Sequence, residues 1–137
     1  MRYLCGLAIV FSIVLWSSCR KDFDTVPNTG NLEFSQDTIY LDTVFTNIGS
    51  STRTLKVYNR SSEDVNIPNI QLSQGESSSY RLNVDGIPGK TFENINILAN
   101  DSIFVFIETT IDINNFPNPD NSFLYTDKIM FDSGTNS

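Results

Sequence analysis

The sequence predicts an all-β domain, an antiparallel sandwich or barrel, that follows an N-terminal secretion signal. Two observations predict the fold. From Leu32 onward, isoleucine, valine and phenylalanine fill short runs, while asparagine, serine, threonine and aspartate fill the gaps between them. Several of these runs alternate apolar and polar residues, as antiparallel strands with one buried face do.

The N-terminus has the order of a secretory signal. Arg2 supplies a positive charge, residues 4–16 are mostly apolar, and the small residues Ser17 and Ser18 precede Cys19. A charge, an apolar core and a small-residue site in that order are typical of a cleaved signal. The apolar stretch is shorter than the ~20 residues that a spanning helix needs, which disfavours the alternative of an uncleaved anchor.

The signal ends in a motif that resembles the lipobox of bacterial lipoproteins, Leu15-Trp16-Ser17-Ser18-Cys19. In that family the chain is cleaved before the cysteine, which then carries the lipid. The resemblance implies a lipoprotein signal peptide over residues 1–18 and lipidation at Cys19. Because an acyl chain binds a bilayer with ~0.8 kcal/mol per buried CH₂, several chains on one cysteine anchor a protein firmly.

A polar, lipidated tether is expected over residues 19–30, where Pro27, Asn28 and Gly30 favour turns. The tether includes Lys21-Asp22-Phe23-Asp24, which resembles the lysine-plus-acidic export signal of Bacteroidota lipoproteins. That resemblance implies a cell-envelope protein, lipid-anchored in the outer membrane and displayed on its outer face. The alternative is a charged linker that water solvates.

Strands follow one another through the exported domain, residues 31–137. We expect them at 32–35, 38–47, 53–59, 64–72, 79–84, 91–98, 102–112 and 125–131. Asparagine, aspartate, glycine and serine mark turns at 47–50, 59–64, 85–86 and 99–101. The two-residue period assigns faces, so Leu55 and Val57 share one side of their strand. Lys56 and Tyr58 fall on the other side.

The stretch 102–112 is the most informative strand. Its aliphatic residues share one face, which we expect in the core: Ile103, Val105, Ile107 and Ile111. Phe104 and Phe106 share the opposite face. Two outward phenylalanines are either covered by the chain's own loops or tether, which we favour, or form a docking patch for another domain or protein.

The order of motifs over the domain carries a second resemblance. Its segments are Leu32-Glu33-Phe34, Asp42-Thr43-Val44, 54–59, 64–67, 98–102 and 107–112. Their order resembles an immunoglobulin-like module of the ASPM/SPD-2/Hydin (ASH) type, and is closest to Bacteroidota lipoproteins that open with such a module. The resemblance implies an antiparallel immunoglobulin-like β-sandwich. Such modules add one more strand after the equivalent of 125–131, so we expect the last strand to be missing and the chain to be incomplete.

Four Asp-Ser/Thr-apolar triplets resemble the acceptor for protein O-glycosylation in Bacteroidota. They make Thr25, Thr38, Thr43 and Ser102 candidate sites, and Thr25 in the tether is the best placed. Three of the triplets begin or lie in expected strands, where the same alternation arises without modification. Modification and ordinary strand sequence are therefore equal alternatives.

Composition and motifs exclude several kinds of chemistry. The chain has 16 acidic and 9 basic residues and no basic stripe, which disfavours nucleic-acid binding. It has no histidine, and its two cysteines lie in the signal and at the lipid site. Ser-His and Cys-His pairs and Cys/His zinc sites are thereby excluded. Residues 112–121 cluster oxygen ligands that suit calcium, but their spacing and two prolines favour an ordinary loop.

We therefore expect a non-catalytic, membrane-tethered structural or interaction module, without metal or cofactor, that acts as a spacer or docking domain. Its partners would be the membrane, through the lipid, and a protein or glycan at the cell surface. The alternative is a carbohydrate-binding accessory lipoprotein, which would need an exposed aromatic platform. Trp16 is lost with the signal and the tyrosines are scattered along the chain, which favours the interaction module.

Overall fold

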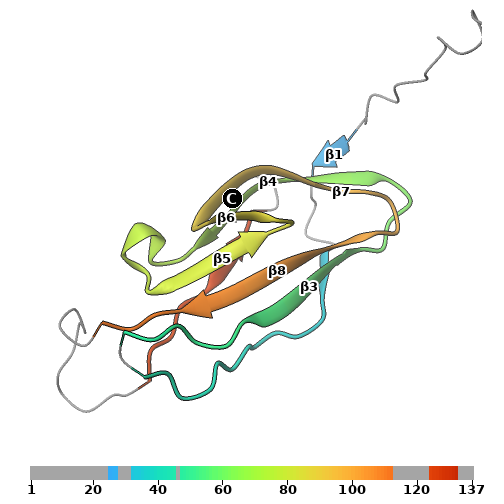
Figure 1. Ribbon diagram of the computed structural model, residues 1–137. Coiled ribbons are helices and arrows are strands. Elements are labelled where there is room, and N and C mark those ends of the chain that lie inside the picture. The colour runs from blue at the N-terminus through green and yellow to red at the C-terminus, as the bar shows by residue number, and fades with distance from the viewer. Residues whose placement is uncertain (1–24, 28–31, 46, 113–123, 133–137) are drawn as a thin grey trace, which may run out of the picture.

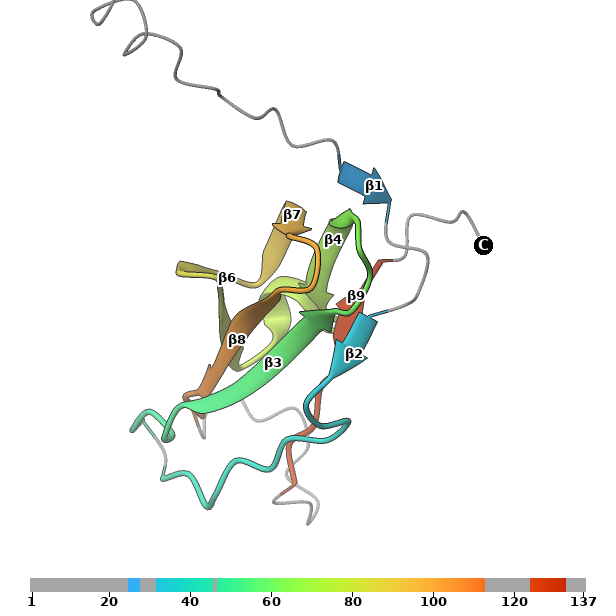
Figure 2. The same ribbon diagram turned by 90° about the vertical axis from the view of Figure 1, so that its right-hand side faces the viewer.

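Two β-sheets with the hydrophobic core between them make up the fold (Figures 1 and 2). The computed structural model describes residues 25–27, 32–45, 47–112 and 124–132. Within those ranges the only helical element is a short 3₁₀ turn, η1 (Gly75–Ser77). All strand pairs but one are antiparallel, so the expectation of an all-β, antiparallel fold is confirmed.

The first sheet is built around β4 (Asp64–Leu72). On one side β4 pairs with β7 (Thr91–Ile97). On the other side, β1 (Thr25–Pro27) pairs in parallel with residues 64–66, and β9 (Ile129–Phe131) pairs antiparallel with residues 70–72. Two short strands therefore share one edge of β4.

Pro68 lies in the middle of β4 and has no ladder partner on β7, because proline has no N–H to donate. Asn94 stands opposite and takes a φ of 54°, a left-handed conformation that asparagine tolerates. The alternation of buried residues shifts at this point. Ile67 and Ile70 are both fully buried although they are three positions apart.

The second sheet has the order β2-β3-β8-β5-β6. Its strands are β2 (Leu32–Phe34), β3 (Arg53–Asn59), β8 (Ser102–Thr109), β5 (Tyr80–Val84) and β6 (Ile87–Gly89). The β5–β6 hairpin turns through Asp85 and Gly86, both with positive φ, as a two-residue type I′ turn requires. The turn expected at 85–86 is thus confirmed.

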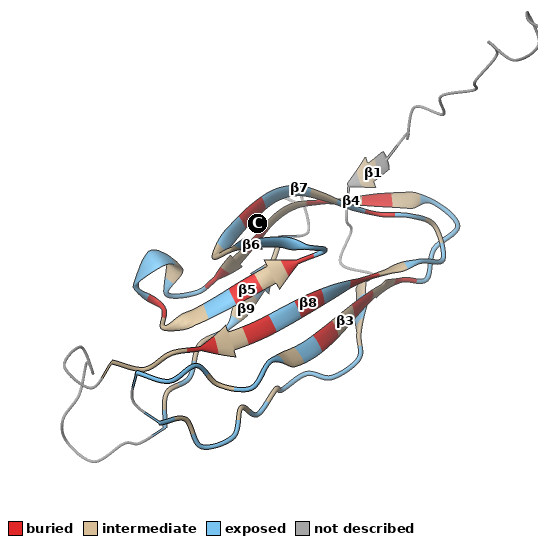
Figure 3. Ribbon diagram, in the orientation of Figure 1, coloured by how far each residue is buried: buried red, intermediate tan, exposed pale blue. Residues whose placement is uncertain are grey.

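The core is made of the inward residues of both sheets (Figure 3). The largest fully buried side chains are Ile67, Ile70, Ile97, Val57, Val84 and Val105. At one edge the core is closed by Phe34 of β2 and Phe131 of β9, whose ring centroids lie 4.9 Å apart. That contact joins the two sheets, so the last described strand is part of the domain.

The strand expected at 38–47 is wrong, because the described part of that segment forms no strand. Ile39 and Leu41 do pack against the core, as their alternation predicts. The ladder beside β3 nevertheless ends at Ser35, whose N–H donates to the carbonyl oxygen of Lys56 at 2.9 Å. The segment therefore makes side-chain contacts without a partner strand.

Several boundaries also differ from expectation. β8 stops at Thr109, because Thr110 forms only an isolated bridge with Gly49. β9 is shorter than the strand expected at 125–131, and β6 and η1 were not expected. β1 lies inside the expected tether. The signal, Cys19, the segment 21–24, most of 112–121 and the final residues lie outside the described residues.

Candidate functional site

The outward side of β3 and β8 carries a row of aromatic residues. The two strands pair antiparallel, with Lys56 opposite Phe104. Because alternate residues share a face, Tyr58 lies beside this pair and Phe106 continues the row. We call these four residues, Lys56, Tyr58, Phe104 and Phe106, the aromatic face.

Both phenylalanines of the aromatic face are open to solvent. Phe104 is 45% exposed and Phe106 is 39% exposed. Their centroids lie 6.2 Å apart and their planes differ by only 18°, so the two rings lie nearly parallel and form one aromatic strip along β8. The loops that the structure describes therefore do not cover the two rings, and cover by the tether stays a prediction because most of the tether lies outside the described residues. The inward assignment of Ile103, Val105 and Ile107 is confirmed, since all three are buried.

Two cations lie over the rings. Lys56 Nζ is 5.0 Å from the centroid of Tyr58 and 5.2 Å from that of Phe104. The guanidinium carbon of Arg60 is 4.3 Å from the centroid of Tyr58. These distances allow cation–π attraction between Lys56 and both rings and between Arg60 and Tyr58. A molecule that approaches Tyr58 or Phe104 therefore meets a positive charge beside the ring.

Ion pairs border the aromatic face at both ends. At one end Arg60 donates to Glu33 at 3.0 Å, and this hydrogen bond raises the pKa of Arg60. At the other end Thr52 donates to Glu108, and this bond, aided by Arg81, lowers the pKa of Glu108. All these groups are solvent-exposed, so the pairs add little stability. Among the described residues Lys56 has no salt bridge.

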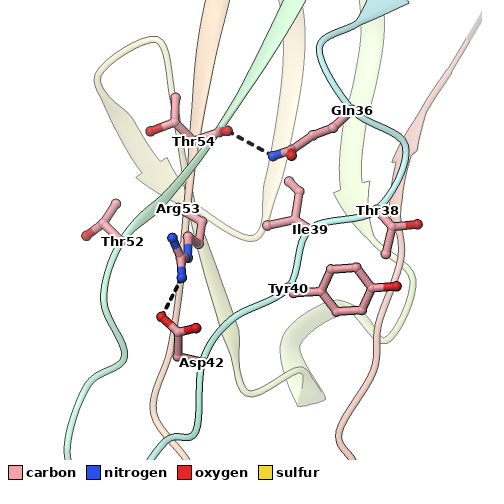
Figure 4. A pocket seen from close by; sticks show the side chains of 8 residues that line it. All are labelled: Gln36, Thr38, Ile39, Tyr40, Asp42, Thr52, Arg53 and Thr54. Atoms are coloured by element: carbon pink, nitrogen blue, oxygen red, sulfur yellow. Dashed lines mark hydrogen bonds and ion pairs between the residues drawn. The ribbon is translucent and has the colours of Figure 1, made fainter.

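A hollow of about 490 Å³ lies between β3 and the segment 36–42 (Figure 4). It is lined by Gln36, Thr38, Ile39, Tyr40, Asp42, Thr52, Arg53 and Thr54. Gln36 Nε2 donates to the carbonyl oxygen of Thr54 at 3.3 Å, and Arg53 forms an ion pair with Asp42. The lining is mostly polar, and the ring of Tyr40 is 80% exposed.

The four candidate glycosylation residues have different surroundings. Thr38 and Thr43 are exposed on the segment that forms no strand, which leaves their backbone accessible. Ser102 is half-buried at the start of β8, where it stands opposite Tyr58 of β3 in the ladder. Thr25 lies in β1, paired with Asp64 rather than in a free tether. Thr38 and Thr43 are thus the better-placed acceptors.

The comparisons with known proteins give no relative. No protein-family model, no curated protein and no solved structure matches the chain. In the part of the chain that the structure describes, no group of three or more acidic, histidine or cysteine side chains is placed to hold a metal ion. Over the same residues, no helix has the length and apolar character needed to cross a membrane.

The sequence did not predict that Lys56, Tyr58 and Arg60 lie together beside Phe104. Lys56 and Tyr58 were assigned outward, but their place beside Phe104 follows from pairing between strands far apart in the chain. Arg60 comes after β3, so no strand pattern includes it. The sequence pattern that could have found them is alternation. Residues 56, 58, 104 and 106 all lie on the outward side of their strands, so they come together once β3 and β8 are paired.

Proposed function

We propose that this chain is a non-catalytic, membrane-tethered interaction module of the cell envelope. A lipid at Cys19 holds it at the outer membrane, and the aromatic face docks a protein partner. The domain is of the immunoglobulin-like ASH type that its motif order resembles. The two-sheet arrangement around one core supports that assignment.

The exposed Phe104–Phe106 strip is the observation that carries the proposal. A sheet with one wet side normally alternates apolar residues inward with polar residues outward. β8 instead places two phenylalanines outward while its inward residues fill the core. An apolar strip with a polar, charged border is the arrangement of a protein-binding surface.

The second candidate function is carbohydrate binding. The observation that favours it is the hollow beside β3, where hydroxyl, amide and charged groups lie near the exposed Tyr40. Sugars also stack on open aromatic faces, however, and Lys56 and Arg60 already occupy positions over Tyr58 and Phe104. A protein partner therefore fits the aromatic face better than a glycan does.

Replacing both phenylalanines, Phe104→Ser with Phe106→Ser, tests the docking proposal. Because the two side chains are 45% and 39% exposed and lie outside the buried core, we expect the free energy of unfolding to fall by only about 1–2 kcal/mol. The double variant should no longer bind the protein partner. Binding is measured by placing a photo-crosslinking residue at Asn83, beside Phe106, in intact cells and identifying the adduct by mass spectrometry.

The matched control is Ile87→Ser, which removes an exposed aliphatic residue of β6 outside the aromatic face. That variant should keep the adduct. A double variant that unfolds several kcal/mol more easily while the adduct persists would show that the strip belongs to the core, and docking through it would be wrong.

The lipid anchor is tested with Cys19→Ala. We expect the intact mass of this variant to show no lipid, because the thiol that accepts it is gone. Cys5→Ala is the control, since Cys5 lies within the signal and should leave lipidation unchanged. The intact mass reports the outcome, and a Cys19→Ala protein that still carries lipid would refute the assignment. Protease added to intact cells should remove the wild-type domain if it is displayed on the surface.

A further inference from the structure

The charged groups of the aromatic face and its border differ in whether they form salt bridges. Two of its bordering carboxylates are already engaged, Glu33 with Arg60 and Glu108 with Thr52 and Arg81. A third, Asp85, is exposed across from Phe104 on the β5 side, away from Lys56. Lys56, at the centre, lies near two rings and forms no salt bridge among the described residues. The face therefore presents a positive charge without a salt bridge between two aromatic rings, on a chain whose formal net charge is −7.

From this arrangement, and resting on the docking function proposed above, we infer the partner's chemistry. The partner is an acidic protein segment that places an apolar side chain on Phe104 and Phe106 and a carboxylate on Lys56. The carboxylate would complete a pair that the domain itself leaves open, and docking would remove that pair from water.

Two features make Lys56 suited to this contact. It is half-buried, and its ammonium nitrogen lies 5.0 Å from the ring centroid of Tyr58 and 5.2 Å from that of Phe104. Its strand position also fixes it directly opposite Phe104 in the ladder, so the charge and the ring face outward together. A charge held within an apolar surface selects its partner more strongly than one at an exposed border does.

A second copy of this chain is a poorer occupant. Two aromatic faces packed against each other about a two-fold axis would bring their Lys56 side chains together. Like charges in one interface are unfavourable, and the carboxylates at its two ends, Glu33 and Glu108, are already paired. A neutral glycan would leave Lys56 without a counter-charge.

The inference is tested by selecting a random displayed peptide library on the full-length protein held in detergent. We expect enriched peptides to carry Asp or Glu close to an aromatic or aliphatic residue. They should bind Lys56→Gln about tenfold more weakly, and their affinity for the wild type should fall with added salt. Lys128→Gln removes an exposed positive charge next to β9, on the other sheet, and should bind them normally.

The outcomes separate the inference from the function on which it rests. Peptides without acidic residues, or peptides that bind Lys56→Gln as well as wild type but lose binding to Phe104→Ser/Phe106→Ser, overturn the acidic partner and leave docking intact. Peptides indifferent to the phenylalanines overturn both. Binding of the wild type to a glycan array, lost in the phenylalanine variant, would replace the protein partner with a carbohydrate.

Discussion

Replacing Asn59 with alanine is expected to lower the free energy of unfolding by about 3 kcal/mol. Asn59 ends β3 and is 3% exposed. Its Nδ2 donates to the carbonyl oxygens of Glu63, Ile97 and Leu98 at 2.7, 3.1 and 3.1 Å. One buried side chain thereby connects the second sheet to the end of β7 in the first. Alanine would leave these carbonyls short of a donor.

The same side chain also shapes its own turn. Its Oδ1 accepts hydrogen bonds from the backbone N–H and the hydroxyl of Ser61, at 3.0 and 2.7 Å. Asn59→Asp would keep this acceptor, remove the donor and bury a carboxylate beside three carbonyls, so it should be at least as destabilising as alanine.

Chemical denaturation measures both variants of Asn59. Asn66→Ala is the control, because Asn66 makes a single side-chain bond, to Asn96, on the outer side of the first sheet. Its cost should stay within about 1 kcal/mol. An Asn59→Ala protein as stable as Asn66→Ala would mean that the three carbonyls find water instead, and that Asn59 does not hold the sheets together.

The strands that could be predicted from the sequence are those whose pattern is local. A backbone with a two-residue period separates inward from outward residues whichever strand lies beside it, so the faces of β3 and β8 were assigned correctly. Turn residues act locally too. Asp85, Gly86 and Asn100 all take the positive φ that their residue types favour.

The failures lie where pairing is decided by distant segments. The segment 38–47 has the alternation of a strand, but its described part forms no ladder. Of those described residues only Asn47, at the end, donates its N–H to a distant segment, to the carbonyl oxygen of Ile111 at 2.9 Å. β1 has only three residues and pairs with a strand far along the chain, so nothing in its own sequence marks it. Pro68 shifts the burial pattern inside β4, which strict alternation does not allow.

For the same reason, only the two phenylalanines of the candidate site could be predicted together from the sequence. Phe104 and Phe106 are i and i+2 in one strand, so their shared outward direction is a local property. Lys56 joins them only through the β3–β8 register, which is a property of the whole fold. The charge on which the proposed acidic partner rests therefore had to come from the structure.

Replacing Ile70 with alanine is expected to cost about 2–5 kcal/mol in the free energy of unfolding. Ile70 is fully buried at the centre of β4. It stands opposite Phe92 of β7 on one side and Phe131 of β9 on the other, so its side chain fills the space between both neighbours. Truncation would remove apolar contacts and leave a cavity that β-sheet neighbours fill poorly. A domain of this size has a marginal total stability, so the loss should be visible as a large fall in the denaturation midpoint.

Two controls set the scale for this substitution. Ile70→Val removes one methylene and should cost about 0.5–1.5 kcal/mol. Ile48→Ala changes an isoleucine that is 60% exposed and should be nearly neutral. An Ile70→Ala cost below that of Ile70→Val would contradict a core centred on β4. Comparing losses in the free energy of unfolding also distinguishes the inner from the outer side of the sheets. The Phe104→Ser/Phe106→Ser protein should lose less stability than Ile70→Ala, although it loses two larger side chains. That inequality is expected because the phenylalanines lie partly exposed on the outer side of β8, whereas Ile70 is fully buried.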